Sequence, residues 1–308
     1  MRIVFMGTPD FAVPCLEAVI NAGHQVVGVF SQPDKPVGRN QIVMPTPVKE
    51  CAQKHNIPVY QPNSLRNDEQ LQLMKELNPE AVAVVAYGKL IPADMLKVAP
   101  FGYVNVHGSI LPKYRGAAPI QWAVVNGDKV TGVTTMLLGE GMDTGDILEV
   151  STTEIGENET AGELFDRLSD MGAELLVSTL SKLEKGVLTP VEQNEDEATL
   201  APIINKEMAL VDFNKSAIEI HNLVRGFNPW PVAYTMLDGK RFKIYETKVA
   251  EFTNIRVGCV KLCDNRIFVG CGNNTSLEFI QIQQEGSRRM TAKELLCGRT
   301  ITENTVFG

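Results

Sequence analysis

The sequence predicts an α/β fold: a doubly wound, mostly parallel sheet, followed by a smaller β-barrel domain. Two patterns indicate this. Over residues 1–188, short apolar segments alternate with amphipathic segments of helical length, which is typical of parallel strands joined by helices. After about residue 205, short segments of alternating polarity are separated by turn residues, which is typical of antiparallel strands. A chain of 308 residues accommodates both domains.

The strands of the first part are short runs rich in Val, Ile and Ala, as expected for strands buried on both faces. They are expected at Arg2–Met6, His24–Phe30, Pro58–Tyr60, Ala81–Ala86, Tyr103–His107, Val130–Leu138 and Ile147–Val150.

Helices are expected where apolar residues recur at helical spacing and a breaker follows, such as Gly23, Gly127 or Gly186. The longest of them opens with a capping box, Thr160-Ala161-Gly162-Glu163. They are expected at Ala12–Ala22, Pro47–His55, Asp68–Leu77, Ala117–Asn126 and Thr160–Lys185. Right-handed crossovers then make the sheet Rossmann-like.

A dinucleotide binder would carry Gly-x-Gly-x-x-Gly after its first strand. Here the loop is Gly7-Thr8-Pro9-Asp10-Phe11, with one glycine. This argues against an NAD-type cofactor. The ligand site is still expected beyond the carboxyl ends of the strands, where open parallel sheets bind ligands.

The predicted domains are 1–188, a linker at 189–205 and 206–308. In the last part, a helix at Ser216–Phe227 precedes five short strands, which suggest a small barrel of the OB type, a fold often used on nucleic acids. The strands are expected at Ala233–Leu237, Arg241–Val249, Gly258–Leu262, Ile267–Val269 and Ser276–Gln281.

Charge differs between the two parts. The whole chain carries a net charge of −8, which argues against wholesale nucleic-acid binding. Residues 206–308 hold 14 Lys and Arg against 11 Asp and Glu, whereas residues 1–205 hold 15 against 26. The net-positive second domain is therefore the better partner for phosphate.

Cysteine spacing indicates neither a disulfide framework nor a metal site. The six cysteines include no Cys-x-x-Cys pair. No apolar run reaches the roughly 18 residues of a membrane span, and no signal-peptide core is apparent. We therefore expect a cytoplasmic protein that has no membrane-spanning segment and binds no metal.

The stretch Tyr103–Pro119 is the most informative one for function. Strand alternation places Asn105 and His107 on one face near the strand end. An amide can donate to a developing oxyanion, and an imidazole can move a proton at neutral pH. The alternative is a turn-capping Asn and a hydrogen-bonded core His. Asp143, in the turn Gly141–Asp146, would by itself more often make local backbone bonds.

These segments carry a family resemblance. The run Asn-x-His-x-Ser-x-Leu-Pro-x-x-Arg-Gly, from Asn105 to Gly116, and the later Gly-Met-Asp-Thr-Gly-Asp at 141–146 resemble the two signatures of the 10-formyltetrahydrofolate-dependent formyltransferase family. The resemblance runs along the whole chain. It implies formyl transfer without a metal, by catalytic residues Asn105, His107 and Asp143, with Asp143 orienting His107. It also implies a folate-contacting segment, made of Ser109, Ile110, Leu111 and Pro112.

The resemblance is strongest to the branch that formylates initiator methionyl-tRNA for translation initiation. The proline-rich loop at 31–47 resembles that branch's tRNA-contacting insertion, with Arg39 at its basic position. Asn40 and Gln41 stand where lysines are frequent. A monomer is expected. Trp230, in a rigid turn before Pro231, is expected more often as a core anchor than as a stacking platform.

Two alternatives remain open. One is a folate-dependent N-formyltransferase that acts on an amino sugar nucleotide, which could share the Asn-His-Asp site. The other is a non-catalytic RNA-binding protein on the same scaffold. The intact triad argues against the second alternative, and the Arg39 loop and the basic second domain favour tRNA over the first.

Overall fold

The computed structural model describes residues 1–37, 42–298 and 301–308. The chain forms two compact units. The first comprises Met1–Gly116, Thr131–Thr153 and Phe165–Ala201, and the second comprises Ala117–Val130, Glu154–Leu164 and Pro202–Gly308. The predicted boundaries at 188 and 205 stay a prediction.

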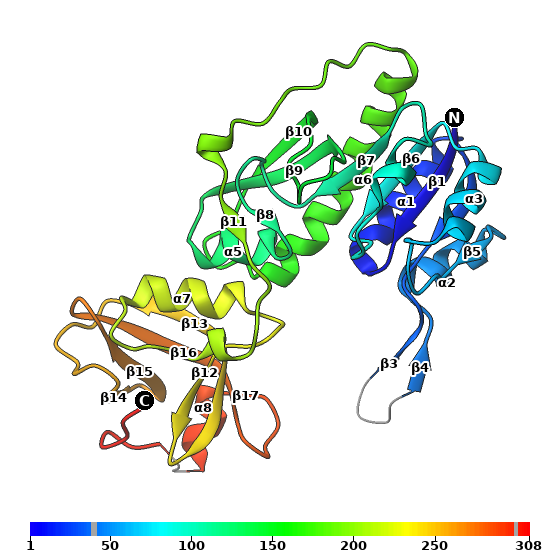
Figure 1. The fold of residues 1–308 in the computed structure, drawn as a ribbon. Coiled ribbons are helices and arrows are strands. Elements are labelled where there is room, and N and C mark those ends of the chain that lie inside the picture. Colours follow the sequence, from blue (N-terminus) through cyan, green and yellow to red (C-terminus); the bar gives the residue numbers. More distant parts are fainter. Residues whose placement is uncertain (38–41, 299–300) are drawn as a thin grey trace. The chain divides into compact units, whose positions relative to one another are not determined.

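The first unit is built on a seven-stranded sheet of order β10-β9-β7-β6-β1-β2-β5 (Figure 1). Five neighbouring strands, β7 to β5 in this order, are parallel, and β9 runs antiparallel to β7. The strands are β1 (Arg2–Gly7), β2 (Gln25–Phe30), β5 (Val59–Tyr60), β6 (Ala81–Val85), β7 (Tyr103–His107), β9 (Val130–Leu137) and β10 (Ile147–Glu154).

Helices connect and cover these strands, as the alternating pattern predicts. Figure 1 shows α6 running alongside the sheet, and the buried hydroxyl groups of Thr135 and Thr179 join strand to helix at 2.8 Å. The helices are α1 (Val13–Asn21), α2 (Pro47–Lys54), α3 (Asp68–Leu77), α4 (Ala93–Leu96) and α6 (Ala161–Glu184). Short 3-10 turns lie at Asp10–Ala12 and Glu195–Glu197.

Two small strand pairs complete the first unit. A hairpin, β3 (Lys35–Val37) with β4 (Ile42–Met44), lies in the segment that the sequence predicts as a loop. Strand β8 (Arg115–Gly116) pairs in parallel with β11 (Leu200–Ala201). Pairs of two or three residues leave too short a pattern to detect in the sequence.

The second unit contains a six-stranded antiparallel sheet around its own apolar core. The path is β12-β13-β16-β15-β14, with β17 on β16. Its elements are α5 (Pro119–Val125), α7 (Ala217–Gly226), β12 (Tyr234–Leu237), β13 (Lys240–Ala250), β14 (Val260–Cys263), β15 (Arg266–Cys271), β16 (Thr275–Gln284), β17 (Met290–Thr291) and α8 (Ala292–Cys297), with a 3-10 turn at Glu207–Ala209.

The predicted fold class is confirmed: a Rossmann-like α/β sheet and a second domain built on an antiparallel sheet.

One expectation is wrong. Trp230 is 52% exposed and therefore not a core anchor; the ring that packs here is Phe227, which is fully buried and meets Trp122 edge-on. Among the described residues, no helix is both long and apolar enough to cross a bilayer.

Candidate functional site

The candidate site lies where the parallel strands end. Because β1, β2, β6 and β7 are parallel, the residues that follow them meet at one edge of the sheet. Thr8 Oγ1 donates a hydrogen bond to the Tyr87 carbonyl oxygen at 3.1 Å, and Gln32 Nε2 donates to the same oxygen at 3.0 Å. The loops after β1, β2 and β6 are thus tied together beside the exit of β7.

Strand β7 supplies the two polar side chains predicted from the sequence. It lies between β6 and β9, so that Asn105 pairs with Val84 on one side and Met136 on the other. Asn105 is 8% exposed and His107 is 6% exposed. No other described residue hydrogen-bonds to the Asn105 side-chain amide, so its NH2 group can donate to a ligand.

The contacts of His107 determine which ring nitrogen is available. Nε2 lies 2.9 Å from the carbonyl oxygen of Tyr114. Since a carbonyl oxygen only accepts, Nε2 carries a proton. Nδ1 faces Asp143, with 3.7 Å between Nδ1 and Oδ2. This distance is longer than a hydrogen bond. Because Nε2 is engaged by the Tyr114 carbonyl oxygen, Nδ1 is the ring nitrogen that is left to interact with a ligand.

Asp143 is brought to His107 by the turn between β9 and β10. Its backbone has a positive φ of 55°, which Asp tolerates better than most residues. Its Oδ2 accepts a hydrogen bond of 2.8 Å from the backbone N–H of Gly116. A Cβ on Gly116 would lie 2.7 Å from the Ala201 carbonyl oxygen, so only glycine fits at the position that holds the carboxylate.

A second layer of residues, not predicted from the sequence, holds this turn. Gln193 is buried, and its Nε2 donates to the carbonyl oxygens of Asp143 at 2.9 Å and Gly145 at 2.7 Å. Its Oε1 accepts from Arg115 Nε and Nη2 at 3.0 and 2.8 Å. Gln193 lies within the run at 189–200 that reads as a polar linker, where the sequence gives no signal for a buried amide.

Arg115 also binds Glu195 in a two-pronged ion pair, with both N–O distances at 2.8 Å. The hydrogen bonds to Glu195 raise the pKa of Arg115 above its ordinary value, and the same bonds lower the pKa of Glu195. This ion pair between Arg115 and Glu195 fixes the plane of the Arg115 guanidinium group. The guanidinium group in turn orients the Gln193 side chain.

The predicted folate-contacting segment follows β7 directly. The Ser109 hydroxyl donates to the Lys113 carbonyl oxygen at 2.6 Å, and Thr134 Oγ1 donates to the Ser109 carbonyl oxygen at 2.6 Å and accepts from the Leu111 N–H at 3.2 Å. Ser109 and Leu111 are buried, whereas Ile110 is partly exposed. The peptide bond between Leu111 and Pro112 is cis. The three hydrogen bonds to Lys113, Ser109 and Leu111 hold the segment as a turn in which Ile110 is the partly exposed apolar residue between two buried ones.

The structure thus brings Asn105, His107, Asp143 and the segment Ser109–Pro112 together in one unit. Arg39, the predicted tRNA contact, lies outside the described residues. The strand that follows it, β4, is exposed along its length at Ile42, Val43 and Met44.

Comparison with known families gives two matches. The family model described as formyl transferase matches residues 1–180, and the model described as formyl transferase, C-terminal domain, matches residues 203–300.

Curated relatives match along their whole length. The chain is 49% identical over 309 aligned residues to the methionyl-tRNA formyltransferase of Caldanaerobacter subterraneus subsp. tengcongensis, covering 100% of both chains. It is 46% identical to the methionyl-tRNA formyltransferase of Clostridioides difficile, again covering 100% of both chains.

Solved structures share the fold at low identity. An N-formyltransferase from Helicobacter canadensis, crystallised with folinic acid and dTDP-3-aminofucose, is 20% identical with a TM-score of 0.70, over 92% of this chain and 99% of that one. HypX from Aquifex aeolicus, in complex with tetrahydrofolic acid, is 16% identical with a TM-score of 0.63, over 96% of this chain and 47% of that one.

Proposed function

We propose that this chain, which belongs to the formyl transferase family, transfers the formyl group of 10-formyltetrahydrofolate to the α-amino group of methionyl initiator tRNA. The observation that carries the proposal is the full-length likeness, at 45–49% identity, to relatives named methionyl-tRNA formyltransferase. The contacts around β7 support it, since they suit transfer of a carbonyl group to an amine.

Asn105 is proposed to stabilise the negative charge that develops on the formyl oxygen. Its amide is held on a buried strand and is not used by other described residues, so it needs no rearrangement to donate. Fixed donors of this kind typically contribute about 10²–10³ in rate.

His107 is proposed to move the proton. The attacking amine must lose one proton, and the leaving N10 of the folate must gain one. With Nε2–H fixed on the Tyr114 carbonyl oxygen, Nδ1 takes up and releases this proton. Asp143 stabilises the charged ring when Nδ1 is protonated, and its 3.7 Å separation from Nδ1 can shorten when substrates bind. The amine is itself the nucleophile, so no acyl-enzyme is required.

The folate is proposed to lie against the segment Ser109–Pro112. The residues present fit a flat, partly apolar ring system, because Ile110 is partly exposed on a turn whose flanking residues are buried and hydrogen-bonded. When bound, 10-formyltetrahydrofolate supplies an activated formyl group next to Asn105 and His107.

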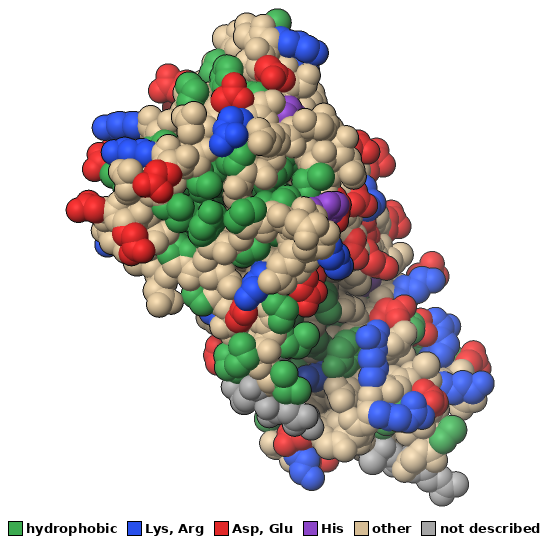
Figure 2. All heavy atoms as spheres, turned by 90° about the vertical axis from the view of Figure 1, so that its right-hand side faces the viewer, with side chains coloured by type: hydrophobic (Ala, Val, Ile, Leu, Met, Phe, Trp, Pro, Cys, Tyr) green, Lys and Arg blue, Asp and Glu red, His purple; other side chains and the backbone are tan. Residues whose placement is uncertain are grey.

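Arg39 and the flanking hairpin are proposed to contact the tRNA. Ile42, Val43 and Met44 are exposed on three successive positions of β4, and neighbouring apolar side chains that are exposed to solvent often mark a binding surface. In the second unit, Lys240, Arg241 and Lys248 are exposed on β13, as a phosphate-binding stripe requires. The face in Figure 2 carries both acidic and basic side chains, so local charge, rather than net charge, decides where tRNA binds.

We expect a monomer in the cytoplasm.

The test is a formyl-transfer assay with labelled 10-formyltetrahydrofolate and three acceptors: methionyl initiator tRNA, methionyl elongator tRNA and a dTDP-amino sugar. We expect rapid transfer to the initiator tRNA alone. Transfer to the amino sugar instead would favour the sugar-nucleotide alternative. Binding of tRNA without transfer to any acceptor would favour the non-catalytic one.

A further inference from the structure

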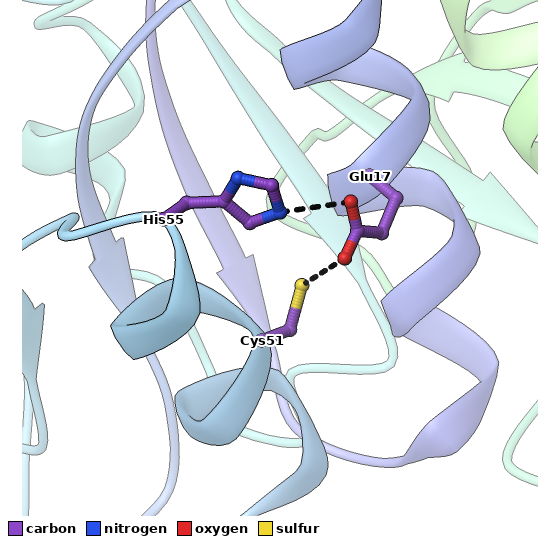
Figure 3. Close-up of side chains that lie close together, drawn as sticks. All are labelled: Glu17, Cys51 and His55. Atoms are coloured by element: carbon purple, nitrogen blue, oxygen red, sulfur yellow. Dashed lines mark hydrogen bonds and ion pairs between the residues drawn. The ribbon is translucent and has the colours of Figure 1, made fainter.

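A second cluster of reactive side chains lies on the helices of the first unit, in elements that the proposed reaction does not use. Glu17 comes from α1, and Cys51 and His55 come from α2 and its C-terminal cap. Figure 3 shows both side chains of the second helix converging on the carboxylate of the first. Their ligand atoms all lie within 4.8 Å of one another.

The contacts in the cluster are direct. Cys51 Sγ donates to Glu17 Oε1 at 3.2 Å, and His55 Nε2 lies 2.9 Å from Glu17 Oε2. Cys51 is 3% exposed, while the side chains of Glu17 and His55 are 38% and 32% exposed. The thiol thus lies on the buried side of the cluster, and the Glu17 carboxylate and the His55 imidazole lie on its solvent-exposed side.

The spacing on the helix explains the convergence. Residues four positions apart lie on the same face of a helix, so Cys51 and His55 point the same way. The two helices pack with Glu17 opposite this face. Three different donors, a thiol sulfur, an imidazole nitrogen and a carboxylate oxygen, therefore meet at one point.

We propose that Glu17, Cys51 and His55 bind a Zn²⁺ ion, with water as the fourth ligand. Zinc prefers these three donor types and tetrahedral geometry. Metal–ligand bonds of about 2.0–2.3 Å at tetrahedral angles separate the donor atoms by about 3.3–3.6 Å. The observed contacts of 2.9 and 3.2 Å are made to the two different oxygens of the Glu17 carboxylate, and all three ligand atoms lie within 4.8 Å of one another. To hold one ion, the carboxylate turns so that one oxygen coordinates, and the sulfur and the imidazole nitrogen draw closer together.

The protonation states of the three side chains are consistent with metal binding at this site. Burial, together with the hydrogen bond to Glu17, raises the pKa of the Cys51 thiol to about 12, so the metal-free thiol is protonated and inert as a nucleophile. When the ion binds, sulfur coordinates as thiolate and its proton passes to solvent. His55 coordinates through an unprotonated Nε2, with the ring proton on Nδ1. Glu17 exchanges two hydrogen bonds for one metal bond.

The bound ion would join α1 to α2, because its protein ligands come from both helices. Helix α2 follows directly on the β3–β4 hairpin. The inference is independent of the proposed reaction, since none of the three residues lies among the candidate catalytic or folate-contacting residues.

Co²⁺ is the probe for this site, because a thiolate ligand gives cobalt a charge-transfer band in the near ultraviolet and tetrahedral geometry intensifies its visible bands. The full chain would be reduced, stripped with a chelator and titrated with CoCl2. We expect both features at one Co²⁺ per chain. Zn²⁺ should then abolish them, because nitrogen and sulfur sites bind zinc more tightly than cobalt.

Two substitutions test the assignment. Cys51→Ser should abolish the charge-transfer band, and His55→Gln should weaken Co²⁺ binding by at least about 100-fold. His55 is partly exposed, so its replacement should leave the fold intact, as circular dichroism would verify. Cys297→Ser is the matched control: this thiol is exposed on α8, and its removal should leave the spectrum unchanged.

Three results would overturn the proposal. They are a titration without any thiolate–cobalt band, a band that survives Cys51→Ser, and a band lost in Cys297→Ser. The first would mean that the three side chains form a metal-free hydrogen-bonded cluster, and the others would mean that another thiol binds the ion. Formyl transfer is measured separately, so failure of the metal site would leave the proposed reaction untouched.

Discussion

Replacing Gln193 with glutamate separates the two tasks of this side chain. The carboxylate keeps an acceptor for Arg115, whose Nε and Nη2 donate to Gln193 Oε1 at 3.0 and 2.8 Å in the unmodified chain. It loses the NH2 group that donates to the carbonyl oxygens of Asp143 and Gly145. The size of the side chain is almost unchanged, so the substitution removes donors without opening a cavity.

The expected effect follows from those two hydrogen bonds. Each is worth about 1 kcal/mol net, and a buried carbonyl left unpaired costs about 1–3 kcal/mol. We expect the free energy of unfolding of the first unit to fall by about 2–4 kcal/mol. The turn that carries Asp143 would also shift, and a displacement of about 1 Å in a catalytic group can cost about 10² in rate. We therefore expect kcat to fall by about 10², with a smaller change in KM.

The assay is steady-state formyl transfer to methionyl initiator tRNA, paired with urea unfolding. Glu195→Gln is the control: it weakens the ion pair with Arg115 but leaves Gln193 and its donors in place. It should cost less than about tenfold in kcat. If Gln193→Glu left kcat within about twofold of the unmodified chain, the idea that Gln193 positions Asp143 would be wrong.

Three further predictions concern individual side chains. Asn105→Ala should lower kcat by about 10² or more without loss of folding; normal turnover would remove its assigned role. Asp143→Asn should lower kcat by a similar factor and change the pH–rate profile, whereas Asp146→Asn, in the same turn, should do neither. His221 is buried in the second unit, and burial lowers its pKa, so the unfolded chain binds a proton more readily than the folded one. Its contribution to stability is present above about pH 6.5 and is lost as pH falls below that value; urea unfolding between about pH 8 and 5 should show a shallower loss in His221→Asn.

The arrangement of Asn105 and His107 could be predicted because it depends on local rules. Strand alternation puts them on one face, and a parallel sheet puts the strand end at the ligand-binding edge. The structure has both residues on β7, flanked by β6 and β9. Asp143 is different: only the family resemblance pointed to it, since a turn aspartate has no local feature that reveals a partner 36 positions earlier.

The supporting contacts could not be predicted for the same reason. Gln193 and Arg115 are 78 positions apart, and a polar run with several carboxylates normally indicates solvent exposure. The local pattern was also a poor guide at Trp230. Large aromatic residues are usually buried, yet the turn between two prolines exposes this ring while Phe227 takes its place in the core.

The two histidine–carboxylate pairs show why composition alone does not determine chemistry. In the pair of His55 and Glu17, Nε2 lies 2.9 Å from the carboxylate, whose other oxygen accepts from a thiol; every group there is engaged in a way that a metal ion could replace. In the pair of His107 and Asp143, Nε2 is engaged by a backbone carbonyl, and Nδ1 stands 3.7 Å from a carboxylate that is held by a backbone N–H. The two rings therefore differ in the group that engages Nε2, a carboxylate shared with a thiol in one pair and a backbone carbonyl in the other. On this difference we propose His55 as a metal ligand and His107 as an acid–base group.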